Sequence, residues 1–164
     1  MAEFIHGNQS IHYELAGVRE FRLRTPVLLL HGNGEDMHIF DNMIAPLLGA
    51  KGFVLMDSRM QGESFSLDGG GEISYSAMAD DAAALMDELG INEYDIVGYS
   101  DGGIIALLMA MKSFKVRRFF TIGANTDPSG LTAKAVREIK TALRRATRPF
   151  ITTRAARLRA LPRR

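Results

Sequence analysis

Short apolar runs alternate with amphipathic stretches over most of this chain. The runs are rich in aliphatic and β-branched residues, as buried strands are, and the stretches between them repeat apolar residues every three or four positions, as helices do. This pattern predicts strands at 27–30, 52–56, 94–97 and 116–122, and helices at about 38–48, 74–89 and 101–112. Strands that alternate with helices indicate an α/β protein, with a mostly parallel sheet and helices on both of its faces.

Two local patterns add detail to this picture. Residues 5–16 have the pattern of a β-hairpin, with Gly7-Asn8-Gln9 as its turn. The helix expected at 38–48 has one apolar face, formed by Ile39, Met43, Ile44, Leu47 and Leu48. We expect this face to pack against the sheet.

Composition is typical of one soluble domain. Of the 164 residues, 46% are hydrophobic and 24% are charged, enough apolar material for a single core. No apolar run reaches the roughly 18 residues of a membrane span, and the N-terminus lacks the regions of a signal peptide. These features predict a cytoplasmic protein with no membrane span. The chain has no cysteine and no zinc-type histidine spacing, so we expect no metal.

The most informative motif is Gly98-Tyr99-Ser100-Asp101-Gly102, a G-x-S-x-G sequence between a predicted strand and a predicted helix. The bare motif is common by chance, but a nucleophilic serine needs this strand–turn–helix context. The two glycines lack the Cβ atoms that would collide as strand and helix close on the turn. The helix N-terminus behind the serine offers free N–H groups and a positive dipole end, which favour an anion.

A second motif, His31-Gly32-Asn33-Gly34, follows the strand at 27–30. Such a loop can present a backbone N–H to a tetrahedral intermediate, and the residue after the nucleophile supplies the second donor. This interpretation assigns an oxyanion hole to the backbone amides of Asn33 and Asp101. The alternative is that the loop is only a glycine turn.

A third motif, D-x-R-x-x-G-x-S at residues 57–64, follows the strand at 52–56. In their order and spacing, the three motifs together resemble the α/β-hydrolase superfamily, in its serine hydrolase branch. That family has H-G-x-G after its third strand, D-x-R-G-x-G-x-S after its fourth and G-x-S-x-G after its fifth. The resemblance covers about residues 1–146. Met60 stands where the family usually has glycine, so we expect that turn to be distorted.

The resemblance implies the α/β-hydrolase fold and an esterase, lipase or peptidase type of activity. Ser100 would attack the carbonyl of a small acyl substrate, the amides of Asn33 and Asp101 would hold the oxyanion, and water would release the acyl group. No cofactor or metal is implied. A serine nucleophile argues against the dehalogenase and epoxide-hydrolase branches, which use aspartate. The alternative function is a non-catalytic scaffold or interaction module that retains the hydrolase core.

A general base is missing from the pattern. In the family the order along the chain is Ser, then Asp or Glu, then His. The four histidines of this chain all precede Ser100; they are His6, His12, His31 and His38. We expect His31 to support its loop by hydrogen bonding rather than to act as the base. The sequence therefore predicts a weakly active or inactive chain.

Two aspartates are candidates for the acid of such a site. Asp127 follows the strand at 116–122, where some branches of the family place their acid, but Pro128 and Gly130 favour a turn-forming role. Asp101 stands at a helix N-terminus, where a carboxylate is ordinary helix chemistry. We expect the backbone of Asp101, rather than its side chain, to contribute.

Charge divides the chain sharply. Residues 134–164 hold eleven Lys and Arg and the single acid Glu138, a net charge of +10, whereas residues 1–133 have a net charge of −9. A basic segment can bind nucleic acid or an anionic membrane. This one has few aromatic residues and no known binding module, so we expect no nucleic-acid partner.

These observations predict a partial hydrolase core at 1–146 and a basic tail at 147–164 outside the family fold. The resemblance would place two more strands after 116–122, so we expect a fold incomplete at its C-terminus, as a truncation or an out-of-frame end would produce. The strand at 116–122 would then be an open sheet edge through which copies of the chain self-associate.

Overall fold

The computed structural model describes residues 2–125, 127–134, 136 and 137. The chain divides into one unit at 1–126 and a second at 127–164. The described part of the second unit includes a short 3-10 helix, η4, at Pro128–Gly130. The predicted tail at 147–164 lies outside the described residues, so the predicted boundary after residue 146 stays a prediction.

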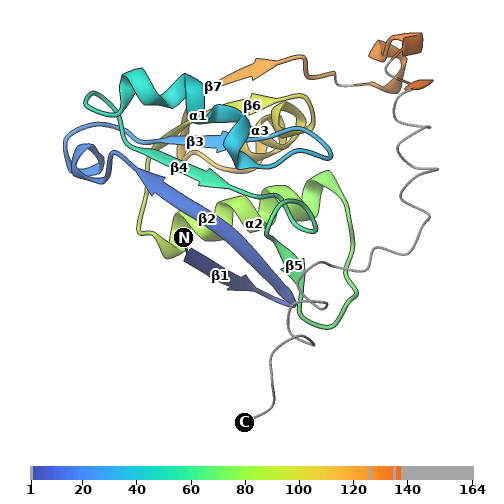
Figure 1. Cartoon of the computed structure of the whole chain (residues 1–164), viewed down its shortest axis with the longest axis horizontal. Helices are drawn as coiled ribbons and strands as arrows, with labels where there is room; N and C mark the ends of the chain where they lie inside the picture. The colour runs from blue at the N-terminus through green and yellow to red at the C-terminus, as the bar shows by residue number, and fades with distance from the viewer. Residues whose placement is uncertain (1, 126, 135, 138–164) are drawn as a thin grey trace, which may run out of the picture. The chain divides into compact units, whose positions relative to one another are not determined.

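The first unit is built on one mixed sheet of seven strands (Figure 1). The strands are β1 (Ala2–His6), β2 (Gln9–Ala16), β3 (Val27–Leu30), β4 (Phe53–Met56), β5 (Phe65–Ser66), β6 (Tyr94–Tyr99) and β7 (Val116–Ile122). Their order is β1-β2-β4-β3-β6-β7, with β5 beside β2. The neighbours β4, β3, β6 and β7 run parallel, and β1, β2 and β5 pair antiparallel. The predicted strands and hairpin are confirmed. Only the two-residue β5 is too short for a pattern to predict.

Each face of the sheet is covered by a hydrophobic cluster. Alternate residues of a strand point to opposite faces, so Leu28 of β3 packs with α2 (Tyr75–Glu88) and α3 (Asp101–Lys112). Its neighbour Leu29 packs on the other face with the helical segment after β3. Helices therefore cover both faces, as the sequence predicts.

The single helix predicted at 38–48 is wrong. The segment is a 3-10 helix η2 (Met37–Phe40), one turn of α-helix α1 (Asp41–Ile44) and a second 3-10 helix η3 (Ala45–Leu47). Pro46 lies in the first turn of η3, and a proline cannot donate the N–H that a continuing α-helix needs.

The predicted apolar face of this segment is also wrong, because the tighter 3-10 turns rotate the face that meets the sheet. Met37, Phe40 and Ile44 are the residues buried against β3 and β4. Of the predicted face, only Ile44 is buried. The other four are exposed by 37–42%, and they are Ile39, Met43, Leu47 and Leu48.

Strand β7 forms an edge of the sheet, since among the described residues it pairs with β6 alone. Its side chains Phe119, Phe120 and Ile122 are 47%, 64% and 42% exposed. An unpaired edge beside exposed apolar side chains is a surface to which other chains can add. The edge position agrees with the sequence analysis, and self-association through it stays a prediction.

Tyr94, the first residue of β6, makes the stability of the fold sensitive to alkali. Its side chain is 1% exposed, and burial together with the charge of Asp87 raises the pKa of its phenol from 10.0 to about 12. Between these two pH values the folded chain keeps a proton that the unfolded chain loses. Stability that is present below pH 10 is therefore lost as the pH rises towards 12.

For a shift of about two pKa units, we expect this loss to reach about 2 kcal/mol by pH 11.5 and about 3 kcal/mol above pH 12. Urea denaturation at pH 9 and at pH 11.5 should show wild type losing more stability than Tyr94→Phe, which has no phenol to titrate. Equal losses in the two proteins would contradict the assignment of this pH dependence to Tyr94.

Candidate active site

Ser100 occupies a strained turn between β6 and α3. Its backbone angles are φ 52° and ψ −116°, a region that residues other than glycine rarely adopt. Hydrogen bonds hold the turn on both sides. The Ser100 N–H donates to the carbonyl of Ile122 at 2.8 Å, and the Gly103 N–H donates to the carbonyl of Ser100 at 2.9 Å. The strand, turn and helix predicted around this serine are confirmed.

The two glycines of the G-x-S-x-G motif lie where backbones touch. A Cβ at Gly98 would lie 2.3 Å from the carbonyl oxygen of Gly102. A Cβ at Gly102 would lie 2.0 Å from the carbonyl oxygen of Leu30, at the end of β3. Any side chain at either position would force β3, β6 and α3 apart, so the glycines are required by close packing.

The loop after β3 meets the same turn. A Cβ at Gly32 would lie 3.1 Å from the Cβ of Ser100 and 2.7 Å from a carboxylate oxygen of Glu35. That carboxylate accepts the Gly32 N–H at 3.1 Å. The structure thus brings together the second motif and the serine of the first, and it places a carboxylate beside them that the sequence analysis did not single out.

His31 supports this loop through hydrogen bonds at both of its ring nitrogens. Its side chain is buried, and its Nε2 accepts the N–H of Ser58 at 2.9 Å. A ring nitrogen that accepts carries no proton, so Nδ1 is protonated and donates to the carbonyl of Gly32, 2.7 Å away. With both ring nitrogens engaged, His31 is not free to take a proton from Ser100. Its role is the supporting one that the sequence analysis expects.

The two predicted oxyanion donors have free backbone amides. Among the described residues, the Asn33 N–H has no hydrogen-bond acceptor. Asp101 is the first residue of α3, and amides in the first turn of a helix have no acceptor within it. Burial raises the pKa of the Asp101 carboxyl, although a hydrogen bond with Tyr75 partly opposes this shift.

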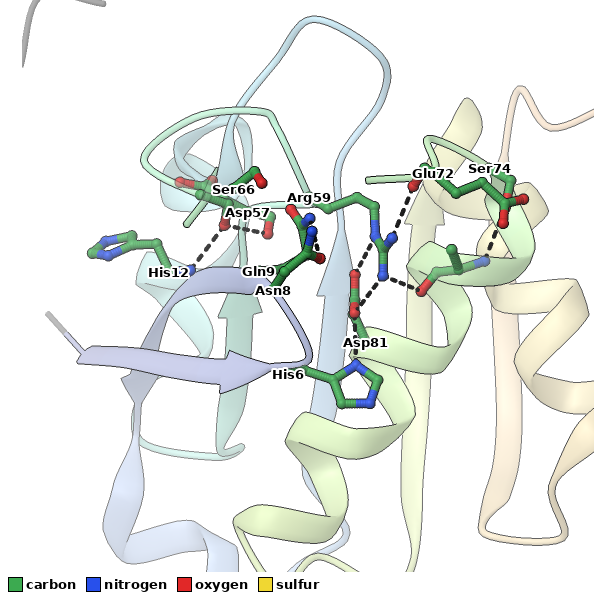
Figure 2. A network of polar contacts seen from close by, with 12 residues as sticks. His6, Asn8, Gln9, His12, Asp57, Arg59, Ser66, Glu72, Ser74 and Asp81 are labelled. Carbon is green, nitrogen blue, oxygen red and sulfur yellow. Dashed lines mark hydrogen bonds and ion pairs between the residues drawn. The ribbon is translucent and has the colours of Figure 1, made fainter. Parts of the chain in front are cut away.

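The third motif builds a polar network rather than a reactive group. Figure 2 shows the Arg59 guanidinium between the carboxylate of Asp81 in α2 and the backbone of the loop before α2. Arg59 donates to both oxygens of Asp81 at 2.6 and 2.7 Å, and also to the carbonyls of Glu72 and Ala77. His6 Nδ1, from β1, lies 2.8 Å from Asp81. Asp81 is fully buried, so this network joins the third loop, β1 and α2.

Asp57, also from the third motif, joins the loops after β3 and β4. One carboxylate oxygen accepts the Met37 N–H and the other accepts the Glu63 N–H, each at 2.8 Å. A Cβ at Gly62 would lie 2.2 Å from this carboxylate, which explains the glycine. The two loops are therefore held in a fixed arrangement.

At Met60, the predicted distortion is confined to the backbone angle. Met60 has φ 62°, a left-handed conformation that glycine adopts freely. The turn keeps its hydrogen bond from the Gln61 N–H to the carbonyl of Ser58 at 3.0 Å.

We expect Met60→Gly to stabilise the protein by about 1 kcal/mol. It removes a strain of about 1–2 kcal/mol, partly offset by the greater freedom of glycine in the unfolded chain. Urea denaturation measures the change. Met60→Ala is the control, because alanine keeps the Cβ and the strain. If alanine stabilises as much as glycine does, strain at this position is not the cause.

Within the first unit, none of the four histidines is hydrogen-bonded to Ser100. Among the described residues, the Ser100 hydroxyl has no hydrogen-bond partner. His38 lies 3.2 Å from Asp41 instead, and the ring of His12 points away from the network in Figure 2. In the second unit, the Asp127 carboxylate accepts the Ser129 N–H at 2.7 Å, and hydrogen bonds with the side chain and then the backbone of Ser129 lower the pKa of this carboxyl. These are the contacts of a turn-forming residue.

The described part of the chain holds no helix that is both long and apolar enough to cross a membrane. Nor do three or more acidic or histidine side chains come together there in a group that could hold a metal ion.

The chain is similar in sequence and in structure to known proteins. A family model described as alpha/beta hydrolase fold matches residues 25–162. Est816, an N-acyl homoserine lactone degrading enzyme, is 22% identical with a TM-score of 0.69, over 85% of this chain and 52% of its own. A thermophilic esterase from Thermogutta terrifontis is 24% identical with a TM-score of 0.67, over 91% and 52%.

A putative epoxide hydrolase from Pseudomonas aeruginosa is 27% identical with a TM-score of 0.62, over 73% of this chain and 39% of its own. The chain thus spans about half the length, or less, of the solved structures it matches. The family model covers most of the chain. The chain belongs to the α/β hydrolase fold family.

Proposed function

We propose that this chain carries the nucleophile and the oxyanion hole of a serine hydrolase acting on an acyl ester or a related carbonyl. The observation that carries the proposal is the strained backbone of Ser100, whose turn lies beside two amides without acceptors. Strain of this kind persists only where the surroundings impose it, and it collects at functional sites.

The proposed chemistry follows from this arrangement. The Ser100 oxygen attacks the substrate carbonyl carbon, and the carbonyl oxygen becomes an oxyanion that the amides of Asn33 and Asp101 stabilise. Collapse of this intermediate expels the alcohol, which takes up a proton, and water then hydrolyses the acyl-serine. The first step also needs a base to accept the hydroxyl proton. No described residue of the first unit is placed for that role.

Because no described residue of the first unit is placed as the base, a second candidate is a non-catalytic scaffold that retains the turn. The two candidates differ in the reactivity of one hydroxyl. A nucleophile in an oxyanion hole reacts with a fluorophosphonate, whose phosphoryl oxygen occupies the hole, faster than an ordinary serine does. Imidazole added to the buffer can supply the missing base.

The test is labelling with a fluorophosphonate probe, with and without imidazole, located by peptide mass spectrometry. We expect label at Ser100 that imidazole accelerates and that Ser100→Ala abolishes. Ser76, an exposed serine on α2, is the matched control, and Ser76→Ala should leave the labelling unchanged. If Ser100 reacts no faster than Ser76 in the presence of imidazole, the scaffold interpretation holds.

A further inference from the structure

In the loop at residues 32–35, three of the four backbone amides donate a hydrogen bond to an acceptor within the protein. The Gly32 N–H donates to the Glu35 carboxylate at 3.1 Å, and the Gly34 N–H donates to the side-chain carbonyl of Gln61 at 2.7 Å. The Glu35 N–H donates to the carbonyl of Gly32 at 3.3 Å. Among the described residues, only the amide of Asn33 in this loop has no acceptor.

The sequence motifs do not specify either of the two acceptor side chains, Gln61 and Glu35. Gln61 occupies an unspecified position of D-x-R-x-x-G-x-S, and Glu35 follows the H-G-x-G sequence. Gln61 nevertheless has a fixed place relative to the loop at 32–35. The Asp57 carboxylate accepts the N–H of Met37, just after this loop, and the N–H of Glu63, two residues after Gln61. The hydrogen bond between Gln61 and Gly34 therefore joins two loops that are already held together.

We propose that Gln61 and Glu35 are positioning residues, which fix the loop at 32–35 so that the Asn33 amide is its one free donor beside Ser100. This inference rests on the function proposed above. Two of the four loop residues are glycines, which rotate easily when their amides are released. A donor helps an oxyanion most when its direction is fixed before the reaction, and both side chains supply that constraint.

The charge of Glu35 acts in the opposite sense to its hydrogen bond. A Cβ added to Gly32 would lie 2.7 Å from the Glu35 carboxylate oxygen and 3.1 Å from the Cβ of Ser100, so the carboxylate and the serine lie close together. A negative charge so close opposes an oxyanion that forms at Ser100. A positioning role and a charge effect therefore predict different labelling rates for the same substitutions. Four variants distinguish the two effects.

Gln61→Met and Glu35→Met remove the acceptor at nearly constant size, whereas Gln61→Glu and Glu35→Gln keep an acceptor and change the charge. The rate measured is fluorophosphonate labelling of Ser100 in imidazole buffer. Removal of a whole oxyanion donor costs about 10²–10³-fold, so a loosened donor should cost about tenfold. We expect both methionine variants to be about tenfold slower than wild type, and both acceptor-keeping variants to restore the rate to within about threefold.

Charge alone would give a different order. Both Glu35 variants would then be faster than wild type, Gln61→Glu would be slower and Gln61→Met would be unchanged, and this result would overturn the proposal. Amide hydrogen exchange provides a second readout, in which the methionine variants should expose Gly34 or Gly32 to exchange while α3 stays protected. If Ser100 in wild type is not labelled at all, the proposed function fails. If it is labelled equally in all variants, only the positioning role fails.

Discussion

Asp81→Ala is expected to lower the free energy of unfolding by about 3–5 kcal/mol, the usual cost of breaking a buried ion pair by removing one partner. Asp81 is fully buried and accepts two hydrogen bonds from Arg59, whose guanidinium is itself largely buried. Without the carboxylate, the buried Arg59 guanidinium keeps its positive charge but loses the ion pair that is in hydrogen-bond contact with it. The contact of His6 with α2 is lost as well. Urea denaturation at neutral pH measures the change.

Asp80→Ala is the matched control, because Asp80 precedes Asp81 in the same helix but pairs with Lys112 at the surface, where both side chains are about half exposed. Such a pair contributes about 0–1 kcal/mol. The expected order is therefore a large loss for Asp81→Ala and a small one for Asp80→Ala. Equal losses would mean that the buried network does not stabilise the fold more than a surface ion pair does.

The parts of the fold that the sequence predicts are those whose signal is local. Strand β3 is four consecutive apolar residues, and helix α2 has an apolar repeat with Ser74 as its N-cap, which accepts the Ala77 N–H. The segment after β3 could not be assigned in this way. Its apolar residues fit an α-helical repeat, but Pro46 and the 3-10 turns place a different set of residues against the sheet.

In the candidate site, too, the residues with a local sequence signal could be predicted, and those with distant partners could not. Ser100, Asn33 and Asp101 belong to motifs that can be recognised within a few residues, and His31 follows from its place in one of them. The residues that fix these motifs in space have distant partners. Gln61 contacts Gly34, 27 residues away, and His6 contacts Asp81, 75 residues away. No pattern along the chain indicates such pairs, because they exist only once the loops have met.

The 164-residue chain is expected to hydrolyse a neutral ester such as p-nitrophenyl acetate barely faster than buffer does. Loss of the serine or the histidine from a catalytic triad costs about 10⁶-fold in kcat. No histidine follows Ser100 in this chain, and His31 uses both of its ring nitrogens to hold its loop. The Ser100 hydroxyl therefore keeps its proton and is a poor nucleophile.

Steady-state rates of wild type and Ser100→Ala should consequently be nearly the same when no external base is present. Imidazole should raise the rate of wild type above that of Ser100→Ala, because it can accept the proton that no described side chain of the first unit is placed to take. The oxyanion donors can then assist attack by Ser100, which the alanine variant lacks. The comparison must subtract the reaction of imidazole itself with the ester. A clear rate without imidazole that disappears in Ser100→Ala and also in His31→Ala would contradict this expectation, because it would identify His31 as a substitute base.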